Sequence, residues 1–118
     1  MSQHNETGQR GERIALKLAQ RLGWPEGQTN VPIAGAEADV VCTRTLAGKR
    51  EALIVEVKTR LGELPEVERV SPRQLAKLRR MADALADAEN LDRVELAVVL
   101  VGLQGQAQTT RWLDVAAF

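Results

Sequence analysis

The chain has 118 residues, of which 44% are apolar and 27% are charged, and its formal net charge is zero. This length suits one domain with a single hydrophobic core. No apolar run approaches the roughly 20 residues that span a bilayer, and the polar start of the chain lacks the apolar segment of a signal peptide. We therefore expect one cytoplasmic domain over residues 1–118, with no membrane partner and with residues 1–7 disordered.

The cysteine and histidine content limits the chemistry that the chain can perform. Cys42 is the only cysteine and His4 the only histidine, which excludes an internal disulfide and a cysteine-cluster zinc site. Catalysis by serine or cysteine paired with histidine is nearly excluded, because the only imidazole lies close to the chain start. Carboxylates, lysine and a bound metal ion remain as candidates.

The apolar pattern predicts the elements in chain order. Helical spacing predicts a first helix over residues 5–22, ended by Gly23 and Pro25. Strands follow over residues 29–33 and 36–44, and a hairpin loop over 46–50 leads into a buried strand over 52–60. After a polar loop over 61–70, Ser71, Pro72 and Gln74 form a strong helix start, and the helix extends to residue 89. The apolar run 94–101 is typical of a central strand, and residues 109–115 could form the last strand.

Two charged residues are set into the buried strand over 52–60. Glu56 and Lys58 are two residues apart, so they share one face of the strand, with Val55 and Val57 on the other. Burying an ion is costly unless it is paired or bound to metal. A structural ion pair at a strand end and a metal site with a lysine beside it are both open interpretations.

The hairpin between the second and third strands brings further carboxylates to this face. Folding the strands back on the loop at Gly48 makes the sum of paired residue numbers about 95, so Asp39 lies opposite Glu56. Glu37, Asp39, Glu56 and Lys58 then converge on one patch. Like charges directly opposite each other destabilise a sheet unless something neutralises them, and a divalent cation would do so.

Two other polar residues each have two interpretations. Glu12 lies on or beside the inward stripe of the first helix. It could belong to the site, but the simpler interpretation is a glutamate near the helix start, where its charge interacts favourably with the macrodipole. Gln74 occupies the capping-box position of the second helix and could serve as a cap or belong to the site.

Basic residues are concentrated in the middle of the chain. Residues 44–80 contain ten basic and five acidic side chains. This excess would favour a polyanion if the basic side chains share a face, and a solvated mixed surface is the alternative.

An acidic residue on one strand, followed by Glu56-Val57-Lys58 on the next, resembles the PD-(D/E)xK signature of restriction-endonuclease-like nucleases. Over most of residues 8–85 the chain resembles the YraN-like family of small bacterial proteins, which resemble Holliday-junction resolvases. The matching stretches are Gly11-Glu12 with Gly23, residues 35–41, residues 54–60, and residues 70–80. The family's Gly-Glu-Ile-Asp stands here as Ala36-Glu37-Ala38-Asp39, and Gln74 stands where the family usually has lysine.

The resemblance implies a restriction-endonuclease-like α/β fold, a mixed central sheet flanked by helices in the order α-β-β-β-α-β-β. It implies a nuclease that uses Mg²⁺ or Mn²⁺ to hydrolyse DNA, including branched DNA, and that forms a homodimer through an exposed apolar strand edge. Asp39, Glu56 and the Val57 carbonyl would hold the metal. The catalytic set would be Glu12, Glu37, Asp39, Glu56, Lys58 and Gln74, and the phosphate contacts would be Arg60, Arg73, Lys77 and Arg80. The alternative is a non-catalytic nucleic-acid-binding or scaffold protein that retains the fold.

Overall fold

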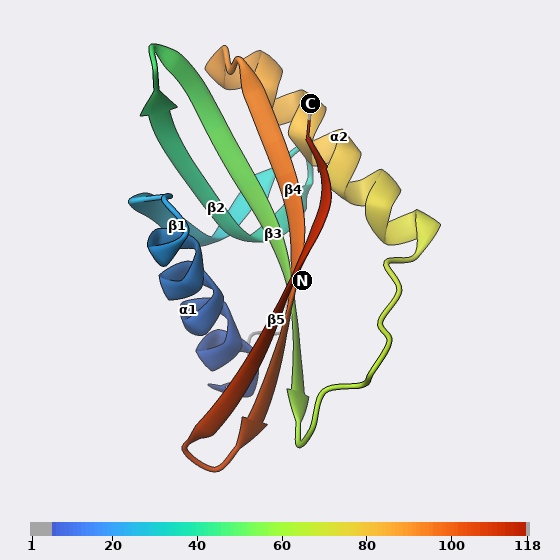
Figure 1. Ribbon diagram of the computed structural model, residues 1–118. Coiled ribbons are helices and arrows are strands. Elements are labelled where there is room, and N and C mark those ends of the chain that lie inside the picture. Colours follow the sequence, from blue (N-terminus) through green and yellow to red (C-terminus); the bar gives the residue numbers. More distant parts are fainter. Residues whose placement is uncertain (1–5, 118) are drawn as a thin grey trace.

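A computed structural model describes residues 6–117 of the chain, and Figure 1 shows a twisted sheet with one helix on each face. The element order is α1 (Glu6–Arg21), β1 (Glu26–Ile33), β2 (Ala36–Leu46), β3 (Lys49–Leu61), α2 (Pro72–Glu89), β4 (Arg93–Gln104) and β5 (Ala107–Ala117). This mixed α/β arrangement and its order confirm the expected fold class. Neither helix is long and apolar enough to cross a membrane, within the residues described.

The five strands form one sheet in the order β1-β2-β3-β4-β5. Only β3 and β4 pair in parallel, and α2 makes the crossover between them. Parallel neighbours need such a crossover, whereas the other pairs are antiparallel and can be joined by short turns. Both strands of the parallel pair lie inside the sheet, with neighbours on each side. Both of their faces are covered, which explains why they read as continuous apolar runs.

The first helix begins at Glu6, within one residue of the start that its helical spacing predicted. Glu6 and Thr7, which we expected to be disordered, belong to α1, and the carboxylate of Glu6 lies in the first turn, where the helix macrodipole favours it. Residues 1–5, which include His4, lie outside the part that the structure describes. The first strand, β1, begins earlier than expected, at Glu26, because it pairs with β2 from Thr43 onward and this pairing overrides the local turn signals.

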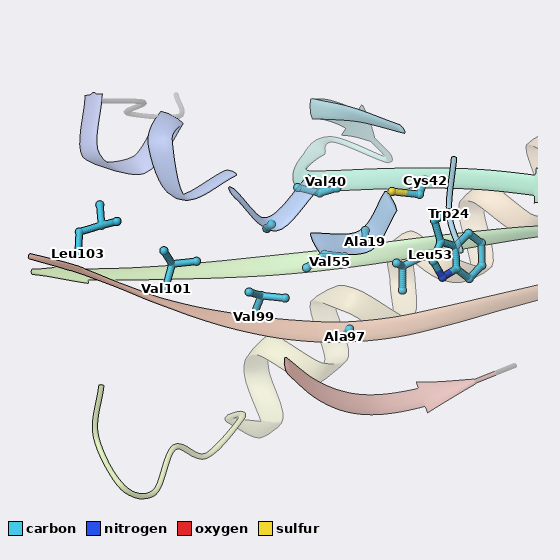
Figure 2. Close-up of a cluster of buried hydrophobic side chains, with 11 residues drawn as sticks. Ala19, Trp24, Val40, Cys42, Leu53, Val55, Ala97, Val99, Val101 and Leu103 are labelled. Carbon is cyan, nitrogen blue, oxygen red and sulfur yellow. The ribbon is translucent and has the colours of Figure 1, made fainter. Parts of the chain in front are cut away.

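The sheet separates two apolar clusters. The cluster under α1 contains Trp24, Cys42 and Leu53 at one end and Leu103 at the other, as Figure 2 shows. The cluster under α2 is built from alternate residues of the same strands, such as Ile54, with Leu78 and Met81 of α2. Because Glu56 and Lys58 follow Ile54 in the alternation along β3, they lie on the face that α2 covers.

Candidate functional site

The hairpin of β2 and β3 brings Asp39 and Glu56 together. Its ladder pairs Val40 with Val55, which confirms the predicted register, and Asp39 and Glu56 are the next residues along the two strands. The backbone N–H of Val57 donates to Oδ2 of Asp39 at 2.8 Å. This hydrogen bond fixes the Asp39 carboxylate on β3 beside Glu56.

Glu56 carries an unsatisfied carboxylate oxygen. Its side chain is 20% exposed, and Nζ of Lys77 lies 3.9 Å from Oε2, too far for a hydrogen bond. Oε2 is buried and has no hydrogen-bond partner within the described chain. Burial raises the pKa of Glu56, the charges of Asp39 and Glu12 raise it further, and Lys77 and Lys58 oppose the change. The ionised form of Glu56 is therefore held at a cost that a bound cation would remove.

Glu12 joins this group of carboxylates from α1. The helix packs closely on β3 at this point, because a Cβ on Gly11 would overlap the Thr59 side chain. Glu12 is only 5% exposed, and Nδ2 of Asn30 donates to its Oε2 at 3.1 Å. The interpretation of Glu12 as a helix-start residue is thus wrong. Glu12 lies beyond the first turn of α1, and its carboxylate is buried and accepts a hydrogen bond from β1.

Asn30 is a site residue that the sequence reasoning missed. The β1–β2 ladder pairs Thr29 with Val40 and Val31 with Ala38, so Asn30 lies opposite Asp39. Its φ of 56° is left-handed, which interrupts the strand at this residue. Asparagine tolerates this conformation better than most residues, and this preference was the available signal.

Lys58 is held by α2 and by the segment before it. Its Nζ donates to Oε1 of Gln74 at 3.2 Å and to Oε1 of Glu68 at 3.1 Å. The carboxylate that pairs with Lys58 is therefore that of Glu68, so the interpretation of Glu56 and Lys58 as a structural ion pair is wrong. Glu68 is a second residue that the sequence reasoning did not select.

Gln74 caps α2, as one of its two interpretations predicted, and it also contacts Lys58. Its side-chain oxygen accepts the backbone N–H of Ser71 at 3.1 Å, and Oγ of Ser71 accepts the Gln74 N–H at 3.1 Å, which completes a capping box. The same oxygen contacts Lys58. The start of α2 is therefore connected directly to β3.

A pocket of about 300 Å³ opens beside Glu56, and its lining is strongly cationic. It is lined by Glu56, Arg73, Gln74, Lys77 and Arg80. Three of the four predicted phosphate contacts thus share one pocket. The fourth, Arg60, lies outside it and pairs through Nη2 with Oε1 of Glu68 at 3.0 Å. Glu37, half-buried on β2 opposite Pro32, does not line the pocket either.

The donor set suits a hard divalent cation that keeps part of its hydration. Within residues 6–117 no three carboxylate, imidazole or thiolate groups are close enough to hold an ion alone. The expected set of Asp39, Glu56 and the Val57 carbonyl needs only two carboxylates, and Mg²⁺ commonly binds through one or two carboxylates, water and substrate phosphate. The unsatisfied Oε2 of Glu56 is an oxygen that such an ion would bind.

Comparisons with known proteins agree with the resemblance seen in the sequence. A UPF0102 protein of Synechococcus sp. (strain CC9902) is 30% identical over 122 aligned positions, covering 98% of this chain and 97% of the relative. UPF0102 proteins of two Porphyromonas gingivalis strains are 38% identical over 60 residues, which cover 51% of this chain and 42% of each relative. The model of the uncharacterised protein family UPF0102 matches residues 11–102, a range that includes Glu12, Asp39, Glu56 and Lys58. The chain therefore belongs to the UPF0102 family, which is the YraN family.

Proposed function

We propose that this protein is a divalent-metal-dependent endonuclease that hydrolyses phosphodiester bonds in DNA, including branched DNA. The observation that supports this most is the position of Glu56: its unsatisfied carboxylate oxygen belongs to a residue that lines a pocket of three cations. A phosphate in that pocket and a metal ion on the carboxylate would lie side by side. Metal-assisted phosphodiester hydrolysis needs this combination.

The carboxylates act as the metal-holding groups. Asp39 and Glu56, with the Val57 carbonyl, would bind Mg²⁺ or Mn²⁺, and the hydrogen bond from the Val57 N–H keeps the Asp39 carboxylate in place. When bound, the ion supplies Lewis-acid polarisation of the phosphate and acidifies water. Glu12, held by Asn30, would bind the ion through water or hold a second ion. Glu37 has the least direct role, because the carboxylates whose charges act on Glu56 are those of Asp39 and Glu12.

The cations act on the phosphate. Lys58 can offset charge that develops on the pentavalent transition state, and its bond to Gln74 keeps the ammonium in one place. Arg73, Lys77 and Arg80 neutralise phosphates, which adds affinity without base specificity. Preference for branched DNA would then depend on the shape of the backbone, since these groups read no bases.

The test is a panel of labelled duplex, flapped and four-way substrates with Mg²⁺ or Mn²⁺. Glu56→Gln and Asp39→Asn are both nearly isosteric. Each should lower the cleavage rate by about a hundredfold or more, the size of effect seen when such electrostatic groups are removed. Asp87 is an exposed carboxylate on α2. Asp87→Asn is therefore the matched control, and it should cut DNA like the wild type. Cleavage that survives unchanged in both site variants would overturn the proposal.

A second candidate function is a non-catalytic nucleic-acid-binding or scaffold protein that retains the nuclease fold. It is favoured by the pairing of Lys58 with Glu68, which neutralises the lysine that catalysis needs. In that case DNA binding should weaken with salt and with loss of Arg73 or Arg80. Removal of Mg²⁺ should then alter neither binding nor the substrate.

A homodimer is part of the proposal, because symmetric cutting of a branched substrate needs two sites. The apolar edge that we expected is not found: within residues 6–117 the large exposed apolar side chains are Leu22, Leu46, Leu61 and Val67, none of them on the edge strands β1 and β5. An interface at either edge would therefore rely on backbone pairing. Light scattering at high concentration measures the mass, and a monomer would remove the dimer from the proposal.

Action on cellular DNA would place the protein in the cytoplasm.

A further inference from the structure

Glu68 occupies a position that the proposed chemistry reserves for substrate. It lies in the irregular segment over residues 62–71, between β3 and α2. Its Oε1 lies 3.1 Å from Nζ of Lys58 and 3.0 Å from Nη2 of Arg60. The side chains of Glu68 and Lys58 are only 12% and 19% exposed, so the contact is largely covered.

An oxyanion shared by an ammonium and a guanidinium is also the arrangement in which these groups bind phosphate. Lys58 and Arg60 are two residues apart on β3 and share the face that α2 covers. Lys58 also contacts Gln74, which lines the cationic pocket. Two anion-binding positions thus lie next to each other. One is the cationic pocket, and the other lies between Lys58 and Arg60, where the Glu68 carboxylate is bound.

The segment that carries Glu68 is anchored on both sides of it. Before it, Leu64 packs against the cluster under α2 and Arg111 donates to the carbonyl of Pro65; after it, Val70 packs against the same cluster. Between these anchors Val67 is 71% exposed. The carboxylate can therefore leave Lys58 and Arg60 by a local change of the segment, without loss of the core contacts.

We propose that Lys58 and Arg60 form a second phosphate subsite, which Glu68 occupies in the free protein and which a nucleic-acid strand enters by displacing Glu68. The identity of the polyanion rests on the proposed function. An intramolecular carboxylate has a high effective concentration, so a single phosphate displaces it poorly. A strand displaces it because its neighbouring phosphate is held at the same time by Arg73, Lys77 and Arg80. The site therefore selects ligands with at least two linked phosphates.

Hydrogen bonds from Lys58, and then from Arg60, hold the pKa of Glu68 below its usual range. Glu68 is therefore ionised at neutral pH and competes with phosphate as an anion. Loss of its charge should strengthen the binding of polyanions beyond the general effect of removing one negative charge from the surface.

The experiment measures binding of a fluorescein-labelled single-stranded oligonucleotide by anisotropy, in EDTA so that nothing is cut, at one fixed salt concentration. Glu68→Gln should bind about fivefold more tightly than the wild type, as expected when two ion pairs no longer compete. Glu66→Gln removes the same charge from the same segment, where the side chain is exposed, and should change affinity by less than about twofold. Adding Arg60→Ala to Glu68→Gln should cancel the gain.

Equal affinities of Glu68→Gln and Glu66→Gln would overturn the subsite. If Glu68→Gln melts far below the wild type, Glu68→Asp replaces it: this variant keeps the charge, withdraws the carboxylate by one methylene and should give a smaller gain, and no gain would likewise overturn the inference. Cleavage with Mn²⁺ is scored separately. A gain in binding with no cleavage by any variant overturns the nuclease and leaves the subsite, whereas Mn²⁺-dependent cleavage without the gain does the reverse. Absence of binding by every variant overturns both.

Discussion

Nζ of Lys58 lies 3.2 Å from Oε1 of Gln74, the same oxygen that accepts the backbone N–H of Ser71. One side chain therefore closes the first turn of α2 and holds the lysine of β3. The cap contributes to the stability of the helix, while the contact with Lys58 affects the charge at the site. These two effects can be separated by substitution.

Gln74→Glu should keep the helix cap and change the charge at the site. Glutamate retains the capping-box acceptor, so the melting temperature should stay close to that of the wild type. Its charge would pair with Lys58 and repel phosphate, so cleavage should fall about tenfold. Ser71→Ala should do the opposite, with about 1 kcal/mol less free energy of unfolding and nearly unchanged cleavage. Denaturant unfolding and cleavage rates measure both, and wild-type cleavage by Gln74→Glu would contradict the assigned role.

Metal binding should depend on Asp39. Mn²⁺ at about a hundred times its dissociation constant should stabilise the wild type by about 2.7 kcal/mol, which corresponds to about 5 °C or more in melting temperature. In Asp39→Asn the amide oxygen can still accept the Val57 N–H, so the metal-free fold should be retained and slightly stabilised by reduced repulsion of Glu56. The Mn²⁺-dependent shift should be absent. Asp39→Ala, which leaves that N–H without its acceptor, should cost about 1–3 kcal/mol. Equal shifts in the wild type and Asp39→Asn would mean that the ion binds elsewhere.

The raised pKa of Glu56 should appear as a pH-dependent stability difference. Because burial and the charge of Asp39 raise this pKa above its ordinary value of 4.5, the folded state binds the proton more tightly than the unfolded state does. Stability is therefore lost as the pH rises through the folded pKa. Glu56→Gln removes this loss, so it should be more stable than the wild type at neutral pH, and the advantage should shrink as the pH falls toward 4.5. Urea unfolding without metal from pH 4 to pH 8 measures it. An advantage that is independent of pH would contradict the prediction.

The cationic pocket predicts which arginines of α2 bind phosphate. Arg73 and Arg80 line it, whereas Arg79, exposed on the same helix, does not. Arg80→Ala should weaken oligonucleotide binding for all sequences alike and reduce the salt slope by about one. Arg79→Ala changes the net charge equally and should have a smaller effect. Anisotropy titrations over a salt series provide the comparison, and equal slopes for the two variants would mean that the pocket is not the binding surface.

The elements and their register could be predicted because their signals are local. Ser71, Pro72 and Gln74 mark the start of α2, and the loop at Gly48 fixes the pairing of Val40 with Val55. This register then brings Asp39 to Glu56, so the acidic core of the site follows from alternation along two strands.

Contacts made by irregular backbone could not be predicted in this way. The segment that contains Glu68 has no periodicity from which a direction could be inferred, so its contact with Lys58 appears only in three dimensions. Asn30 fits a strand pattern, and that pattern does not indicate the left-handed φ that interrupts the pairing opposite Asp39. The helical spacing left two interpretations of Glu12 open, because spacing along a helix contains no information about the strand that the helix packs on.

The last prediction separates the backbone of Asn30 from its side chain. Glycine adopts the φ of 56° freely, whereas alanine does not. Asn30→Gly and Asn30→Ala both remove the amide that donates to Glu12, so they lose the same hydrogen bond. Their stabilities should differ by about 1 kcal/mol in favour of glycine, the cost of the left-handed conformation for a residue with a Cβ.

Metal binding should not follow this difference in stability. If Asn30 holds Glu12 for the metal site, both variants should need about tenfold more Mn²⁺ for half-maximal stabilisation, a loss typical of groups that orient metal-binding residues. The metal dependence of the melting temperature measures this in each variant against its own metal-free baseline, which removes the backbone effect. A Mn²⁺ requirement that stays at the wild-type level in Asn30→Gly and rises only in Asn30→Ala would show that strain, and not the lost amide, disturbs the site. Asn30 would then be a structural residue of β1.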